Sequence, residues 1–383
     1  MITVRPNSHV HELITFLSYV GEFPYASIHL LGNKEVWRKL ISKLAHEQEY
    51  RFPDKADRIT CRLLNVTGKG KDKTIRLTQK GLSVLGMVNS DALQYYNWAY
   101  PPQNRSGDTQ RIDRRHRVAE ASAFIRSTGI ETDPCKLPPL QNLAIKKIVP
   151  KEPSFYISHE LKHIEDDHVN KIGFSRITGM LFCPDNCYPI YNSRDYWMGW
   201  NGRGESKVKQ YLASIVRLNA GMIPVDSALL LGKDYTVADL TLQHLRKVKR
   251  PEDRFDAIYN HLHFIPMDPF GKRLLKILTL PDWNSTLLNL LFEEDCLSGD
   301  SAIFAYDAFE DGTYVLSFLG SDIFKLNAFF STVKAQRYKA SVICFPEQVA
   351  FLRNFLGSGI SLNTVSLDMV EEAIFSEGCG VHE

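Results

Sequence analysis

The segment from residue 33 to residue 45 constrains the fold more than any other, because its side chains divide into two faces at helical spacing. The apolar face consists of Val36, Trp37, Leu40, Ile41 and Leu44. The polar face consists of Lys34, Arg38, Lys39, Ser42 and Lys43. Asn33 is a favoured residue type for capping such a helix. We therefore predict a helix that packs on one side and presents cations on the other.

A β pattern with a basic turn follows this helix. Residues 58–66 and 74–77 predict two strands, and the Gly- and Lys-rich stretch 67–73 predicts a flexible hairpin between them. The cations of this hairpin are Lys69, Lys71, Lys73 and Arg76. Thr78 is expected to cap a further helix that runs to about Met87. The hairpin and the basic helix face together predict one positively charged surface.

Two shorter helices are predicted earlier in the chain. Ser8 is expected to cap one over residues 9–20, the other covers residues 26–31, and a glycine ends each of them. Three helices, a basic hairpin and a further helix are the plan of a winged helix. The stretch 77–81, Leu-Thr-Gln-Lys-Gly, resembles the Leu-Thr-x-x-Gly that closes the wing in many winged-helix proteins. The resemblance covers about residues 8–90 and implies a domain that binds double-stranded DNA.

Cationic side chains concentrate in the first third of the chain. Residues 1–120 hold 19 Lys and Arg against 12 Asp and Glu, a net charge of +7, whereas the whole chain carries +2, which leaves −5 for the remainder. Duplex DNA carries one negative charge per ~1.7 Å of its axis, so it attracts clustered cations. The predicted DNA-contacting residues are Lys34, Arg38, Lys39, Ser42, Lys43, Lys69, Lys71, Lys73, Arg76, Arg114 and Arg115. The alternatives are a solvated basic surface and a winged helix that docks a protein.

A domain boundary is predicted near residue 105. A helix rich in aromatic residues is expected over 91–100, and the stretch 101–107 that follows it is rich in helix-breaking residues. We therefore place the DNA-binding domain at 1–105, a connector helix and linker at 106–153, and an α/β body at 154–383 with a subdomain break near 220–226. Residues 111–126 predict a helix with an arginine-rich start. Arg114 and Arg115 either extend the phosphate-binding surface or form the solvated start of a docked helix.

Residues His159-Glu160-Leu161-Lys162-His163 match H-E-x-x-H, a pattern in which two histidines one helical turn apart bind zinc and the glutamate polarises a water. His168 lies one position short of the third-ligand spacing of metzincins. Cys183 and Cys187 flank a turn between two predicted strands, and two cysteines fall short of the four ligands of structural zinc. We therefore predict a solvated helix start without metal or cofactor. A zinc metallopeptidase that uses His159, Glu160 and His163 is the alternative.

A wider resemblance follows from the order of the segments. The winged-helix pattern precedes the basic helix 111–126, the block 173–179 (Gly-Phe-Ser-Arg-Ile-Thr-Gly), the block 188–192 (Tyr-Pro-Ile-Tyr-Asn) and a Lys-bearing helix over 205–218. This order resembles the replication-relaxation family of mobile-element proteins over about residues 8–220. The resemblance implies DNA processing during replication or conjugative transfer of a plasmid or similar element. It also implies a second domain with a restriction-endonuclease-like core.

The sequence departs from the catalytic pattern of such nuclease cores. They require an acid in one strand, an acid followed closely by Lys in the next, and a divalent metal. Thr178 stands where the first acid is expected, and the nearest substitutes for the second pair, Asp195 and Lys207, have the wrong spacing. We therefore expect any nuclease-like core to be degenerate and inactive.

The C-terminal half alternates between strand and helix patterns. Strands are predicted at 227–231, 256–266, 313–319 and 340–345, and helices at 236–248, 270–278, 322–336 and 346–356. This alternation, with apolar strands, predicts a mostly parallel sheet covered by helices. The fold class is therefore α/β, or α+β over the whole chain.

These observations predict a non-enzymatic, DNA-binding accessory protein of a mobile genetic element. Its α/β body would bind a protein partner of a DNA-processing complex, or a second copy of the chain to form a homodimer. Seven scattered cysteines and the lack of a long apolar stretch predict a cytoplasmic protein without membrane contact. The alternatives are the zinc peptidase, a divergent metal-dependent nuclease and a winged-helix transcriptional regulator.

Overall fold

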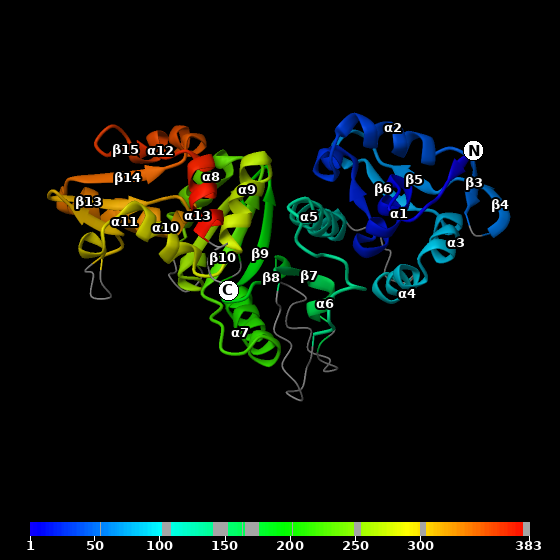
Figure 1. Ribbon diagram of the computed structural model, residues 1–383, viewed down its shortest axis with the longest axis horizontal. Helices are drawn as coiled ribbons and strands as arrows, with labels where there is room; N and C mark the ends of the chain where they lie inside the picture. The colour runs from blue at the N-terminus through cyan, green and yellow to red at the C-terminus, as the bar shows by residue number, and fades with distance from the viewer. Residues whose placement is uncertain are drawn as a thin grey trace. The chain divides into compact units, whose positions relative to one another are not determined.

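The computed structural model describes residues 1–53, 55–101, 109–140, 152–162, 164, 176–200, 202–248, 254–298 and 304–377. The chain folds into two compact units (Figure 1). The described residues of Met1–Asn142, Ser154–His168 and Thr178–Met180 form the first unit, and those of Leu143–Pro153, Val169–Ile177 and Leu181–Glu383 form the second. Both units mix helices with sheets, which confirms the predicted α/β class at this level. No helix in the described part of the chain combines the length and apolar character needed to cross a bilayer.

The first unit holds helices around short strands. Its helices are α1 (His9–Val20), a 3₁₀ helix (Tyr25–Leu31), α2 (Lys34–Leu44), α3 (Gln79–Val88), α4 (Ser90–Ala99), α5 (Thr109–Arg126) and α6 (Ser158–Lys162). Its strands are β1 (Ile2–Thr3), β2 (Phe23–Pro24), β3 (Gln48–Phe52), β4 (Lys55–Cys61), β5 (Leu64–Thr67), β6 (Thr74–Leu77) and β7 (Ser154–Ile157).

The capping residues predicted from the sequence act as caps in the structure. The Ser8 side chain accepts a hydrogen bond from the backbone of His11, and the Thr78 hydroxyl accepts one from Gly81 at 2.9 Å. The Asn33 side chain accepts bonds from the first turn of α2, including one from Glu35 N at 3.0 Å. These bonds satisfy backbone donors that the helices leave unpaired, so the predicted starts of α1, α2 and α3 are confirmed.

The single strand predicted over 58–66 is wrong. The structure divides this stretch between β4, which pairs with β3, and β5, which pairs with β6 in a different sheet. Leu63 and Leu64 are both buried. One strand cannot bury two successive side chains on a single face, because successive side chains point to opposite faces.

Helix α5 belongs to the first unit, whereas the sequence placed it in a connector outside the N-terminal domain. It packs on β2, on the 3₁₀ helix and on α1. The side chains of its second half, including Phe124 and Ile125, are fully buried. The N-terminal core is therefore completed by residues beyond the boundary predicted near residue 105.

The second unit alternates strands with helices. Its helices are α7 (Gly202–Asn219), α8 (Tyr235–Leu245), α9 (Pro269–Leu278), α10 (Trp283–Leu291), α11 (Ile323–Gln336), α12 (Val349–Leu356) and α13 (Leu367–Glu377). Its strands are β9 (Cys187–Arg194), β10 (Ser227–Gly232), β11 (His261–Pro266), β12 (Ala308–Glu310), β13 (Thr313–Ser317), β14 (Ala340–Cys344) and β15 (Ser361–Thr364), and the residues of β8 (Ile177–Phe182) are divided between the two units. Of these, α10, α13, β12 and β15 were not predicted, and β11 is shorter than the strand expected over 256–266.

The strands of the described residues form four sheets. Their strand orders are β1-β3-β4, β2-β6-β5, β11-β10-β9-β8 and β12-β13-β14-β15. The β9, β10 and β11 strands run parallel, as do β13, β14 and β15, whereas β12 pairs antiparallel with β13. The mostly parallel character that the alternating pattern predicted for the C-terminal half is therefore confirmed.

Candidate nucleic-acid interface

Helix α2 presents the basic face that the sequence predicted. Trp37, Ile41 and Leu44 are buried and fix the orientation of the helix, whereas Val36, expected in the core, is 45% exposed. The side chains exposed on the opposite face are Lys34, Arg38, Lys39, Ser42 and Lys43. The cations of α2 therefore form one exposed face of the helix, which no apolar side chains cover.

The Arg38 guanidinium is paired only weakly within the helix. Arg38 lies 2.7 Å from Glu35 in the preceding turn, and both side chains are more than half exposed. Exposed pairs of this kind contribute about 0.2–1 kcal/mol, since water screens them. A polyanion can therefore compete for Arg38 at low energetic cost.

The β5–β6 hairpin carries the lysines of the predicted turn. Lys69 is exposed at its tip, and the side chain of Lys71 lies outside the described residues. Gly68 has a φ of +85°, and a Cβ built there would lie 2.5 Å from the carbonyl oxygen of Asp72. Glycine is thus required at this position for the hairpin to close.

Tyr25 connects the base of this hairpin to α2. Its backbone N–H donates to the carbonyl of Lys73 at 2.8 Å, and the Lys73 ammonium lies 4.4 Å from the centroid of its ring. Tyr25 also lines an open groove together with residues of α2. The lining residues of this basic groove are Tyr25, Arg38, Lys39, Ser42, Lys43, His46 and Gln48. Sequence reasoning missed Tyr25, His46 and Gln48, because a groove depends on which segments become neighbours.

Arg76 and Arg115, two of the predicted DNA contacts, are engaged inside the unit. Both guanidinium groups pair with the carboxylate of Glu22, which is 1% exposed, and the Arg115 Nε–Oε1 distance is 2.7 Å. Glu22 directly precedes β2, so this ion pair ties β2 to β6 and α5. Arg114 is partly exposed on α5 and does not line the basic groove. These ion pairs hold β6 and α5 against the residue that precedes β2.

The H-E-x-x-H residues show no assembled metal site in the described part of the chain. The His159 ring is 4.8 Å from that of Trp98 and stacks on that of Tyr100 at 5.8 Å. The Glu160 carboxylate accepts a bond from Ile157 N at 3.3 Å, and burial raises its pKa to about 8. His163 and His168 lie outside the described residues. Among the described side chains, no three His, Cys, Asp or Glu residues lie close enough to hold a metal ion.

The strands β8 and β9 hold polar residues in structural roles. Thr178 and Asn192 are buried, and the Asn192 side chain accepts a hydrogen bond from Arg194 N at 2.9 Å. Asp195 and Lys207 are both exposed. The buried acid of this region is Glu205, whose carboxylate accepts bonds from Arg176 N at 2.9 Å and from the Tyr191 hydroxyl at 3.0 Å. This role of Glu205 was missed, because its partners come from outside its own helix.

The turn between Cys183 and Cys187 is confirmed. Cys183 N donates to the carbonyl of Asn186 at 2.8 Å, and β8 and β9 extend from the two sides of the turn. Both thiols are buried, and burial raises their pKa values. They are therefore neutral packing groups at ordinary pH.

No protein-family model matches the chain, and comparisons with curated proteins and with solved structures found no significant match.

Proposed function

We propose that the first unit binds double-stranded DNA through the basic groove and the adjacent β5–β6 hairpin. The observation that carries this proposal is the position of Tyr25, which lines the groove with α2 and bonds to the base of the hairpin. Two basic elements separated in the sequence therefore share one surface. Scattered surface lysines would have no reason to converge in this way.

The chemistry of the groove suits a duplex. An α-helix fits the major groove of B-DNA, where Arg38, Lys39 and Lys43 would face base edges and phosphates. The hairpin, with Lys69 at its exposed tip, would follow the neighbouring phosphates. A recognition helix flanked by a basic hairpin is the docking plan of winged-helix domains. Arg76 and Arg115 would hold the hairpin in place from behind through Glu22.

For the whole chain we propose the role of an accessory protein in replication or mobilisation of a mobile genetic element. The resemblance to the replication-relaxation family supports this role. The second unit would bind a protein partner or a second copy of the chain, and it would contribute no catalysis.

The test is binding of a labelled random-sequence duplex at several salt concentrations. The variant Lys39→Glu/Lys43→Glu/Lys69→Glu removes three predicted phosphate contacts, so the slope of log K against log salt should fall by about 0.9 per contact, or about 2.7 in total. The matched control Lys233→Glu/Lys276→Glu/Lys339→Glu changes the net charge equally at exposed positions of the second unit.

Tight, salt-sensitive binding that the groove variant loses and the control keeps would support the proposal. Equal losses of DNA binding in both variants would show that the effect comes from net charge alone. Absence of binding at low salt would exclude DNA as the partner of the groove.

A further inference from the structure

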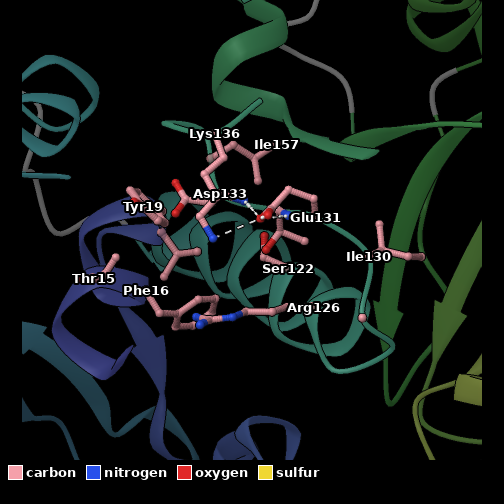
Figure 2. Close-up of a pocket in the computed structure, with 13 residues that line it drawn as sticks. Thr15, Phe16, Tyr19, Ser122, Arg126, Ile130, Glu131, Asp133, Lys136 and Ile157 are labelled. Atoms are coloured by element: carbon pink, nitrogen blue, oxygen red, sulfur yellow. Dashed lines mark hydrogen bonds and ion pairs between the residues drawn. The ribbon is translucent and has the colours of Figure 1, made fainter. Parts of the chain in front are cut away.

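A second cavity lies inside the first unit, away from the basic groove. It is formed by α1, α5, the loop around residues 129–136 and β7 (Figure 2). Its volume is about 230 Å³. Pockets for drug-sized ligands span roughly 300–1,000 Å³, so this cavity suits a smaller metabolite.

Two buried hydroxyl groups lie at this cavity, and the one on Thr15 has no hydrogen-bond partner among the described residues. They belong to Thr15 and Tyr19 on α1, which are 8% and 5% exposed. Burial, followed by a hydrogen bond with the Asp133 carboxylate, raises the pKa of Tyr19, so its hydroxyl stays a neutral donor. Buried polar groups in folded proteins nearly always have partners, because an unpaired group costs folding free energy. The unpartnered Thr15 hydroxyl at this cavity therefore indicates a bound polar molecule.

The cavity also holds one cation and one carboxylate that form no ion pair within the described chain. The Arg126 guanidinium rests 5.8 Å from the centroid of the Phe16 ring. The Asp133 carboxylate accepts bonds from Cys135 N at 2.9 Å and from the Tyr19 hydroxyl. Figure 2 shows Arg126 beside Phe16 and Asp133 on the side of Tyr19. The cavity thus has a positive charge on one side and a negative charge on another.

Glu131, the other acid of the cavity, is already used by the fold. Its Oε1 accepts bonds from Thr132 N and Asp133 N, each at 2.9 Å, and its Oε2 lies 3.6 Å from the Lys136 ammonium (Figure 2). These contacts fix the loop that carries Asp133. Arg126 and Asp133 are therefore the charges left for a ligand.

We propose that this cavity binds a free α-amino acid with an apolar side chain. Arg126 would bind the carboxylate, and Asp133 would bind the ammonium group. The Thr15 hydroxyl would complete the hydrogen bonds of the carboxylate. Apolar side chains of the lining, Val20, Ile130 and Ile157, are buried and would surround the ligand side chain. Such a site would make the first unit responsive to a small metabolite, independently of DNA.

The test uses the full chain and the free amino acids alanine, valine, leucine and isoleucine at millimolar concentration. At least one should raise the melting temperature of the first unit in a concentration-dependent way, because a ligand that binds only the folded state stabilises it. The matched probes are its amide, which lacks the carboxylate, and its N-acetyl derivative, which lacks the ammonium. Calorimetric titration should show each derivative binding about tenfold more weakly or worse.

The variants separate the two charge contacts. Arg126→Gln should lower the affinity for the free amino acid about tenfold and leave the affinity for its amide nearly unchanged. Asp133→Asn should likewise lower the affinity for the free amino acid and leave that for the N-acetyl derivative nearly unchanged. Lys276→Gln, at an exposed position of the second unit, should change neither affinity. Circular dichroism would verify that each variant is folded. No shift with any of the four amino acids, or tight binding that survives both variants, would overturn the proposal.

Discussion

The ion pair around Glu22 predicts a specific loss of stability in the first unit. The perturbation is Glu22→Gln, which keeps the shape of the side chain and removes its charge. Glu22 is 1% exposed, and it pairs with Arg76 of β6 and Arg115 of α5. The substitution therefore leaves two guanidinium groups next to a neutral amide at the junction of three elements.

The magnitude follows from burial. Removing one partner of a buried ion pair costs about 3–5 kcal/mol, because the remaining charge is uncompensated. The Arg76 and Arg115 side chains are 35% and 22% exposed, so water can rehydrate them in part. We therefore expect a loss of about 2–3 kcal/mol, below that range. For a unit of this size each kcal/mol lowers the melting temperature by about 2–4 °C, which gives a shift of about 4–12 °C.

Differential scanning calorimetry should detect this shift in the transition of the first unit. The control is Glu35→Gln, which removes a glutamate paired with Arg38 at the exposed surface and should cost less than about 1 kcal/mol. A second variant, Glu22→Leu with Arg76→Met and Arg115→Met, removes every charge and should recover most of the loss. Equal melting temperatures for Glu22→Gln and Glu35→Gln would refute the argument that burial makes this pair important.

Two further predictions concern the second unit. Burial alone would raise the pKa of Asp322, but the hydrogen bond from His261 and the nearby imidazoles lower it to about 2, and the same bond raises the pKa of His261. The contribution of Asp322 to the free energy of unfolding is lost as the pH falls from the ordinary pKa of an aspartate toward 2. The contribution of His261 is lost as the pH rises through its raised pKa. Asp322→Asn keeps the helix cap. In urea unfolding the wild type should therefore be more stable than this variant by about 2 kcal/mol, and this difference should be largest between about pH 4 and 6.5. A difference that does not change with pH would contradict the argument. Gly271→Ala would place a Cβ 1.8 Å from the carbonyl oxygen of Pro266, and should cost about 3 kcal/mol by the same assay. Gly359→Ala, with no atom within 4 Å, is its control, and equal costs would show that α9 can move away from β11.

Local chemistry explains what the sequence could predict. Helix caps act within three residues of chain, so Ser8, Asn33 and Thr78 were recognisable, and the two faces of α2 follow from spacing alone. The prediction failed at Val36, whose place in the apolar stripe did not ensure burial.

Features set by distant partners could not be predicted in this way. Arg115 pairs with a residue 93 positions away, so its charge alone suggested an exposed phosphate contact. Strands as short as β1 and β2 have no periodicity to detect. The basic groove was half predictable: its α2 residues followed from the helical pattern, but Tyr25 entered it only through the pairing of its backbone with Lys73.

The docking of α5 has a practical consequence for dissecting the chain. A recombinant fragment that ends near residue 100 would lack α5 and expose the apolar surface that Phe124 and Ile125 cover. It would also remove Arg115 from Glu22 and lose the loop that carries Asp133. Such a fragment should aggregate or bind nonspecifically, and its behaviour would say little about the intact protein. Fragments intended to isolate the N-terminal activity should therefore retain α5, the loop after it and β7.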